Sequence, residues 1–220
     1  MRIIHNKKMI SGIPWLACSG GVDSIAVAHY LYLQRIEFRI LHIHHGYQDI
    51  NDKMCDAVVN FAQDYGIEEY TIHLQSFKKI PGESDESVMH KCRIKAYNQL
   101  SESIITCHHL DDCVESYLMN CFNGVGEYLP IPVETKLDNG YKIIRPFIMN
   151  SKADFIKHVN HYHFLKKYIV EDPTNNDTSF RRNWIRNSII PQCTDKGIGF
   201  KSLIRKRYLD VENSRNNQPV

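Results

Sequence analysis

The stretch Ser19-Gly20-Gly21-Val22-Asp23-Ser24 follows an apolar run at residues 13–18 and leads into an amphipathic segment at residues 23–35. Glycines let a backbone approach oxyanions closely, and a helix N-terminus directs N–H groups and the positive end of its dipole at them. The hydroxyls of Ser19 and Ser24 add further donors. Strand, glycine turn and helix in this order predict a phosphate-binding loop. The alternative is a glycine-rich turn without a ligand.

The loop contains no lysine, which separates it from loops that hold β- and γ-phosphates through a lysine side chain. Asp23 stands where that lysine would be expected, and a carboxylate beside phosphates is favourable when a divalent cation bridges them. The loop resembles that of the ATP pyrophosphatases, which cleave ATP to AMP and pyrophosphate while adenylating an acceptor. The resemblance implies that ATP binds at Ser19, Gly20, Gly21, Val22, Asp23 and Ser24, with Mg²⁺ held by Asp23.

The composition is that of a globular chain, with 220 residues, 43% hydrophobic and 24% charged. No apolar run approaches the roughly 18 residues of a membrane span, and the N-terminus lacks a signal-peptide core. We therefore expect a cytoplasmic protein without membrane contact. The seven cysteines include no C-x-x-C pair, so a zinc ribbon or a cysteine-ligated iron–sulfur cluster has no local support.

Short apolar segments alternate with segments of helical period. Strands are expected at residues 14–18, 38–44, 69–74, 103–107 and 141–146, and helices at 23–35, 51–65, 84–101, 110–122 and 151–165. This alternation predicts an α/β fold of three layers around a parallel sheet, similar to Rossmann-like and adenine nucleotide alpha hydrolase-like domains. Asn139-Gly140 predicts a tight hairpin, and Ser151 with Asp154 predicts a capping box.

The C-terminal part is basic. Residues 181–220 hold nine lysines and arginines and three acids, a charge of +6, whereas the net charge of the whole chain is only +2. This asymmetry favours a polyanionic partner, and the alternative is a solvated tail. We expect a catalytic domain over residues 1–192, ending in a short helix at 184–190. A basic tail over 193–220 would be helical at 201–212 and disordered in its last eight residues.

A second motif follows the strand expected at residues 103–107: Thr106-Cys-His-His-Leu-Asp-Asp-Cys-Val-Glu115. The carboxyl ends of parallel strands share one edge, so this motif should face the phosphate loop. Histidines beside carboxylates can hold Mg²⁺, bind an amine or accept its proton. Ordinary helix capping explains part of the acidic pattern. A zinc site at His42, His44, His45, His108 and His109 is an alternative without a closed ligand set.

Over residues 14–192 the chain resembles the catalytic domain of tRNA(Ile)-lysidine synthase. The family's His-His-x-Asp-Asp-x-x-Glu segment is matched by His108, His109, Asp111, Asp112 and Glu115. Further matches, in the family's order, are Glu86 with Arg93, Arg145-Pro146, Glu171-Asp172-Pro173-Thr174-Asn175, and Arg182-Asn183-Trp184-Ile185-Arg186. Family members usually continue into C-terminal domains that help grip the tRNA.

The resemblance implies ATP-dependent ligation of L-lysine to C2 of the wobble cytidine of a CAU-anticodon tRNA(Ile), through an adenylated cytidine. It implies catalytic roles for Asp23, Asp111, Asp112, Glu115 and Arg93, with Asp112 and Glu115 binding the amine. ATP contacts would also come from His45, His108, His109 and Arg145. RNA phosphates would be held by Arg182, Asn183, Arg186, Lys201, Arg205, Lys206 and Arg207.

Three other functions stay open. The first is another reaction of the same superfamily, such as tRNA 2-thiolation, although the cluster-dependent kind is disfavoured because C-x-x-C is missing. The second is amidation of a small metabolite, which the basic tail and the missing glutaminase domain disfavour. The third is a non-catalytic RNA-binding remnant, which the two intact motifs disfavour. The oligomeric state is open, and a homodimer is one alternative.

Overall fold

The computed structural model describes residues 3–46, 49–73, 85–126 and 129–216. Six strands form a sheet in the order β3-β2-β1-β4-β6-β5. They are β1 (Trp15–Ala17), β2 (Arg39–His44), β3 (Glu69–His73), β4 (Ile104–Ile105), β5 (Glu134–Lys136) and β6 (Lys142–Ile144). Neighbouring strands are parallel except β5 and β6, which are antiparallel. The expected α/β fold is confirmed, and β5 is the strand that the sequence pattern did not predict.

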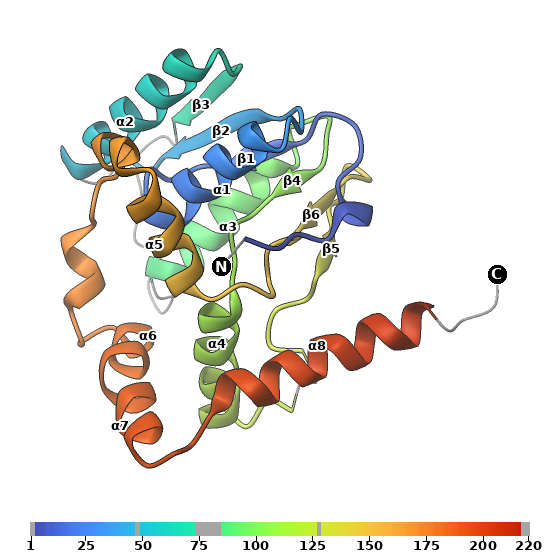
Figure 1. Ribbon diagram of the computed structural model, residues 1–220, viewed down its shortest axis with the longest axis vertical. Helices are drawn as coiled ribbons and strands as arrows, with labels where there is room; N and C mark the ends of the chain where they lie inside the picture. Colours follow the sequence, from blue (N-terminus) through green and yellow to red (C-terminus); the bar gives the residue numbers. More distant parts are fainter. Residues whose placement is uncertain (1–2, 47–48, 74–84, 127–128, 217–220) are drawn as a thin grey trace.

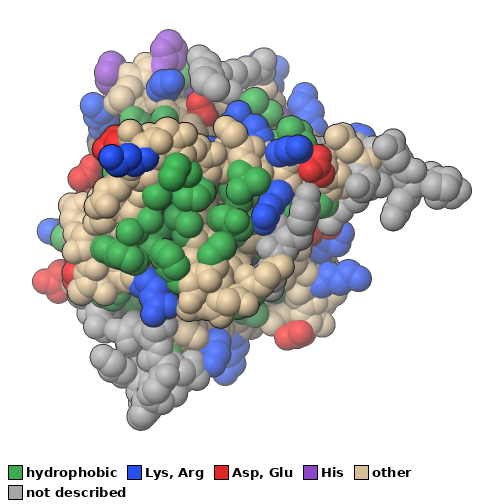
Figure 2. Space-filling view, turned by 90° about the horizontal axis from the view of Figure 1, so that it is seen from below, with side chains coloured by type: hydrophobic (Ala, Val, Ile, Leu, Met, Phe, Trp, Pro, Cys, Tyr) green, Lys and Arg blue, Asp and Glu red, His purple; other side chains and the backbone are tan. Residues whose placement is uncertain are grey.

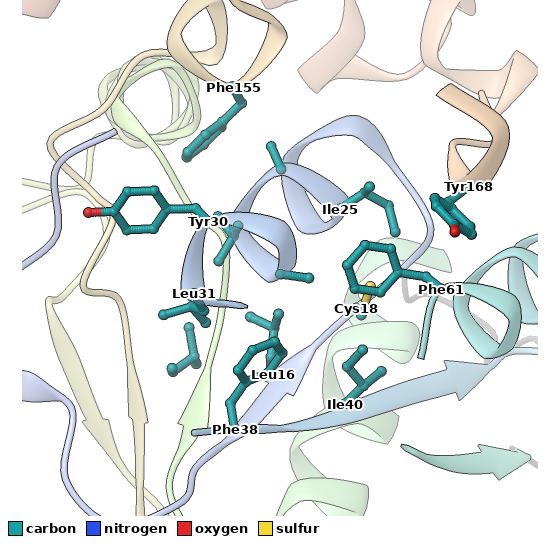
Figure 3. Close-up of a cluster of buried hydrophobic side chains, with 14 of the residues drawn as sticks. Leu16, Cys18, Ile25, Tyr30, Leu31, Phe38, Ile40, Phe61, Phe155 and Tyr168 are labelled. Carbon is teal, nitrogen blue, oxygen red and sulfur yellow. The ribbon is translucent and has the colours of Figure 1, made fainter. Parts of the chain in front are cut away.

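Helices cover both faces of this sheet (Figure 1). The main ones are α1 (Val22–Leu33), α2 (Asp49–Tyr65), α3 (Asp85–Tyr97), α4 (Leu110–Phe122) and α5 (Lys152–His161). On one face Ile25 of α1, Phe61 of α2 and Phe155 of α5 are fully buried in one apolar cluster (Figure 3). On the other face Tyr97 of α3 packs in a separate cluster with Trp15 and other side chains of the strands. The three expected layers are therefore present.

Two local predictions are confirmed, the hairpin at Asn139-Gly140 and the capping box of Ser151 with Asp154. The turn between β5 and β6 contains Gly140 at φ +88°, a conformation that glycine adopts without strain. Asp154 accepts hydrogen bonds at its Oδ2 from the backbone N–H and the hydroxyl of Ser151, at 2.8 and 2.7 Å, which begins α5. The helix expected to reach residue 165 instead ends at His161, and a 3₁₀-helix, η2 (His163–Tyr168), follows.

The C-terminal part differs from the expectation. It holds η3 (Pro173–Asn176), α6 (Arg181–Trp184), the π-helical turn η4 (Ile185–Ile189), α7 (Ile190–Asp195) and α8 (Phe200–Asn216), and another short 3₁₀-helix, η1 (Lys7–Met9), lies near the N-terminus. The short helix expected at residues 184–190 begins earlier, at Arg181, and continues through Pro191 to Asp195. A π-turn widens the backbone just before Pro191. The wider turn makes room for the proline ring and accommodates the loss of the hydrogen bond that proline cannot donate.

Helix α8 packs on the body of the protein. Ile204 and Tyr208 are buried against Leu118 and its neighbours on α4. The Tyr208 hydroxyl donates to the carbonyl of Ile131 at 2.5 Å and accepts from its N–H at 3.3 Å. The expected disorder of the last eight residues was wrong for residues 213–216, which lie in α8, because these contacts anchor the helix; residues 217–220 lie outside the described residues. The domain boundary at residues 192–193 stays a prediction.

The strand order places the loops after β1 and β4 side by side. From β1 the sheet grows through β2 in one direction and through β4 in the other, so the order reverses between β1 and β4. Crevices at such a reversal, beyond the carboxyl ends of the strands, are the usual ligand sites of open α/β sheets. Within the described part of the chain, every helix is too short or too polar to span a membrane.

Candidate active site

The loop after β1 has the geometry of an anion site. Gly20 has φ +80°, and a Cβ there would lie 3.1 Å from the carbonyl oxygen of Met54, so glycine is required. Ser24 donates from its hydroxyl to the carbonyl of Gly21 at 3.0 Å and lies 3.4 Å from the hydroxyl of Ser19. Gly21 caps α1, whose twelve residues direct a helix N-terminus into the loop. These predicted residues thus lie together in a turn whose geometry can accommodate phosphate oxygens.

His109 joins this loop to the start of α4. Its Nε2 lies 3.6 Å from Oδ2 of Asp23, and its ring is almost fully buried. Its backbone N–H donates to Oδ2 of Asp112 at 3.0 Å, which forms the capping box of α4. Burial opposes protonation of the ring, but the carboxylates of Asp23, Asp112 and Asp111 outweigh burial and raise the pKa of His109. Two segments some ninety residues apart in the sequence thus meet at one charged cluster.

Asp23 has the donor chemistry that a magnesium ion requires. Its Oδ1 is buried and has no hydrogen-bond partner among the described residues, whereas its Oδ2 faces His109 and, at 3.9 Å, the ammonium of Lys152. A hard cation that takes its other ligands from phosphates and water fits one such carboxylate. The described residues include no group of three or more His, Cys, Asp or Glu arranged for a metal. The zinc alternative therefore gains no support.

His45 and His108 are neutral groups at the same edge. Burial, with the positive charge of Arg93 nearby, lowers the pKa of His45 to about 4. Burial likewise lowers the pKa of His108 to about 4 against the opposing effect of Asp112, and Arg145, Arg182 and Arg93 lower it further. Nδ1 of His108 lies 2.9 Å from the hydroxyl of Thr106. Neutral imidazoles here can exchange hydrogen bonds with a nucleotide without adding charge.

Arg145 is more deeply placed than expected of a phosphate ligand. Its side chain is buried, and its Nη1 donates to the carbonyl of Pro132 at 2.7 Å and to the hydroxyl of Thr135 at 3.0 Å. These bonds brace the segment that leads into β5. Its Nε is buried without a hydrogen-bond partner among the described residues.

Glu115 lies about one turn after Asp112 on α4 and is almost fully buried. Arg186 holds it in a two-point ion pair, with Nε and Nη2 at 2.6 and 2.8 Å from the two carboxylate oxygens. Arg182 adds an ion pair at 3.2 Å and donates to the hydroxyl of Ser116. Two arginines expected to hold RNA thus lie against a glutamate expected to be catalytic. Nothing in the motif that ends at Glu115 or in the block at residues 182–186 indicated that these two segments pair.

The basic residues of α8 divide into two groups. Lys201 reaches the site, with its Nζ 2.6 Å from Oδ1 of Asp111, while the backbone N–H of Lys152 donates to Oδ2 of the same carboxylate at 2.9 Å. These contacts outweigh burial and lower the pKa of Asp111. Further along the helix, Arg207 lies 4.8 Å above the ring of Tyr117, and Arg205 and Lys206 are exposed.

The segment after η2 lies beside the phosphate loop. The backbone N–H of Val170 donates to the carbonyl of Gly20 at 2.9 Å, directly before the Glu171-Asp172-Pro173-Thr174-Asn175 block. Asn183, an expected RNA ligand, instead donates to the carbonyls of Thr174 and Asp177 and holds this block. The side chain of Lys152 is a site residue that sequence reasoning missed, because the first turn of a capped helix carries no catalytic signal.

The sheet is mostly parallel and flanked by helices, and a lysine-free glycine loop and an acidic, histidine-capped helix lie at its strand reversal. These features define an α/β protein of the nucleotide-binding class. The family model described as a PP-loop domain matches residues 5–193, and the chain belongs to this family.

The chain is similar to curated tRNA(Ile)-lysidine synthases, as the resemblance in its motifs predicted. It is 27% identical to that of Actinobacillus pleuropneumoniae serotype 3 over 87% of this chain and 45% of the relative. It is 30% identical to that of Pseudomonas putida over 86% of this chain and 46% of the relative. The chain thus spans less than half of the length of these relatives.

Solved structures show the same fold. A tRNA thiolase with its 4Fe–4S cluster from Methanococcus maripaludis has a TM-score of 0.73 at 20% identity, over 95% of this chain and 74% of that one. An NMN synthetase from Francisella tularensis has a TM-score of 0.51 at 14% identity, over 94% and 87%. At these identities the likeness concerns the fold alone.

Proposed function

We propose that this protein ligates L-lysine to C2 of the wobble cytidine of a CAU-anticodon tRNA(Ile), with cleavage of ATP to AMP and pyrophosphate. The observation that carries the proposal is the contact of Asp23 in the phosphate loop with His109 at the start of α4. It joins a nucleotide cradle to the carboxylates that an amine substrate requires. The names of the relatives support lysine as the amine and tRNA as the acceptor.

The first step would form an adenylated cytidine. O2 of the cytidine attacks the α-phosphorus of ATP, and pyrophosphate leaves. Ser19, Ser24 and the N-terminus of α1 would hold the phosphates, and Asp23 would hold Mg²⁺, which neutralises charge on them when bound. Arg93 is the proposed cation for the α-phosphate, because its charge acts on both His45 and His108 at the rim of the site.

The second step joins the ε-amine to C2, and AMP leaves. A free lysine ammonium has a pKa near 10.4, so it must lose a proton before it attacks. Asp112 would hold the ammonium and accept the proton, with Asp111 beside it. Arg186 and Arg182 already hold Glu115, so it would act mainly by keeping those arginines and the amine pocket in place.

The thiols beside the site support ligation over thiolation. All seven cysteines are free; Cys18 directly precedes the phosphate loop, and Cys107 directly precedes the His-His pair of the second motif. Burial raises the pKa of both thiols, although hydrogen bonds to Cys18 oppose the shift. A buried thiol of high pKa is a poor nucleophile. Lysine attachment needs no cysteine at all.

Residues 1–192 would form the catalytic unit of a cytoplasmic enzyme, with residues 193–220 as its basic C-terminal part. The exposed Arg205 and Lys206 are the proposed RNA phosphate ligands on α8, since Lys201 and Arg207 already contact Asp111 and Tyr117. Phosphate contacts of this kind position an RNA without reading its sequence.

Mass analysis of nucleosides tests the proposal. A CAU-anticodon tRNA(Ile) is incubated with the protein, ATP, Mg²⁺ and isotope-labelled lysine, digested, and analysed. We expect a cytidine that has gained labelled lysine with loss of one water, and none with Asp23→Ala. A sulfur-containing nucleoside, or the label on no nucleoside, would reject lysine ligation.

A further inference from the structure

Two aromatic side chains lie exposed at the far end of α4. The rings of Phe122 and Trp184 have centroids 6.1 Å apart and planes inclined by 36°, and the residues are 52% and 39% exposed. Arg181 donates from Nη1 to the side-chain oxygen of Asn123 at 2.9 Å, which ties its guanidinium to the residue that follows Phe122. We call Phe122, Trp184 and Arg181 the aromatic platform. None of its members has a part in the site described above.

The platform belongs to an apolar face with a basic border. Figure 2 shows apolar side chains gathered on the face seen from below, with lysines and arginines around them. The C-terminal end of α4, α7 and α8 lie at this end of the molecule (Figure 1). On α4, in the residues just after it and from residue 180 onward, the large exposed apolar residues are Phe122, Val125, Phe180, Trp184, Ile198, Leu203 and Leu209. Most of them lie in the part of the chain that carries a charge of +6.

One helix connects the platform with the active site. Asp112 lies in the first turn of α4 and Phe122 is its last residue, so ten residues, or about 15 Å at 1.5 Å per residue, separate them. Arg182, next to Arg181, contacts Glu115 and Ser116 between the two. Stacked nucleotides rise about 3.4 Å each along a strand. A strand with one nucleotide at Asp112 therefore reaches the platform about four nucleotides away, or fewer when extended.

We propose that the platform is a stacking site for an unpaired base of the RNA substrate, a few nucleotides from the base that is modified. The proposal rests on the proposed function. Single-stranded RNA is typically bound by aromatic faces and arginine planes within a basic surface. A second copy of the chain fits less well, because a two-fold contact would set the same basic border against itself.

Fluorescence of Trp184 gives a direct readout, since the chain has two tryptophans and the other, Trp15, is buried in β1 under Arg39. The full chain is titrated with a stem–loop RNA carrying the CAU anticodon. We expect quenching in the wild type and none in Trp184→Phe, which keeps a stacking face and still binds. The double variant Phe122→Ala, Trp184→Ala should bind at least fivefold more weakly. The salt dependence should stay unchanged because no phosphate contact is lost.

The control is Phe164→Ala, which removes a similarly exposed ring on η2 and should bind RNA like the wild type. Equal RNA affinity of the double variant and the wild type would overturn the platform while leaving the proposed function intact. If the double variant has a changed sedimentation coefficient but the RNA affinity of the wild type, the platform is likewise overturned and this face is a contact between protein chains. Failure of the wild type to bind the stem–loop would reject both the platform and the proposed function.

Discussion

Gly20 shows how one residue sets the geometry of the phosphate loop. The Gly20→Ala variant should place a Cβ 3.1 Å from the Met54 carbonyl in a conformation with φ +80°. We expect a loss of about 1–3 kcal/mol in the free energy of unfolding and a weaker ATP complex. Gly124→Ala is the matched control, because Gly124 has φ +69° with open space around it. Denaturant unfolding should show a smaller loss for Gly124→Ala; an equal loss would mean that the Met54 contact is unimportant.

Asp112 is the residue on which amine binding depends in the proposed mechanism. Asp112→Asn keeps an oxygen for the capping box but removes the charge that holds an ammonium. A lost charged hydrogen bond costs about 1.5–3 kcal/mol, so the lysine KM or turnover should worsen at least tenfold. Lysine-dependent kinetics that match the wild type would place the amine elsewhere.

At the scale of elements, the buried hydroxyl of Tyr208 adds a polar contact to the apolar packing that holds α8 on the body of the protein. Tyr208→Phe would leave the carbonyl and N–H of Ile131 without that partner. We expect a loss of about 1–3 kcal/mol in the free energy of unfolding, measured with urea. Tyr32→Phe, at a position 46% exposed on α1, should change little. If both variants unfold at the same urea concentration, Tyr208 does not anchor α8.

The contact between α1 and α5 predicts a loss of stability in acid. His29 lies buried with its Nδ1 2.9 Å from Nε2 of His158, and burial with the His158 charge lowers the pKa of His29 to about 4. The unfolded ring takes a proton near pH 6.5, so the unfolded state binds more protons between pH 6.5 and 4. Stability should therefore fall as the pH drops through this window, by up to about 1.4 kcal/mol per pH unit for this group.

Thermal unfolding across pH 4–7 measures this effect. His29→Asn should unfold with a shallower pH dependence than the wild type, whereas His163→Asn, at an exposed position on η2, should keep the wild-type dependence. Parallel curves for the wild type and His29→Asn would show that this histidine pair does not set the acid response.

At the scale of the whole molecule, local patterns predicted most of the fold. The loop at residues 19–24 and the start of α4 were predictable because each is a contiguous strand–turn–helix with its own capping chemistry. The pairing of Glu115 with Arg182 and Arg186 was not, because about seventy residues separate these charges in the sequence. The anchoring of α8 likewise depends on a tertiary contact of Tyr208, which a basic composition conceals.

In the proposed mechanism the loop after β1 and the start of α4 form one site that cleaves ATP between its α- and β-phosphates. This mechanism is tested most directly by identifying the products of ATP labelled at the α-phosphate, with Mg²⁺, lysine and a CAU-anticodon tRNA(Ile). We expect labelled AMP, with pyrophosphate formed in equal amount, only when the tRNA is present, and none with Asp23→Ala. Labelled ADP as the main product would contradict it.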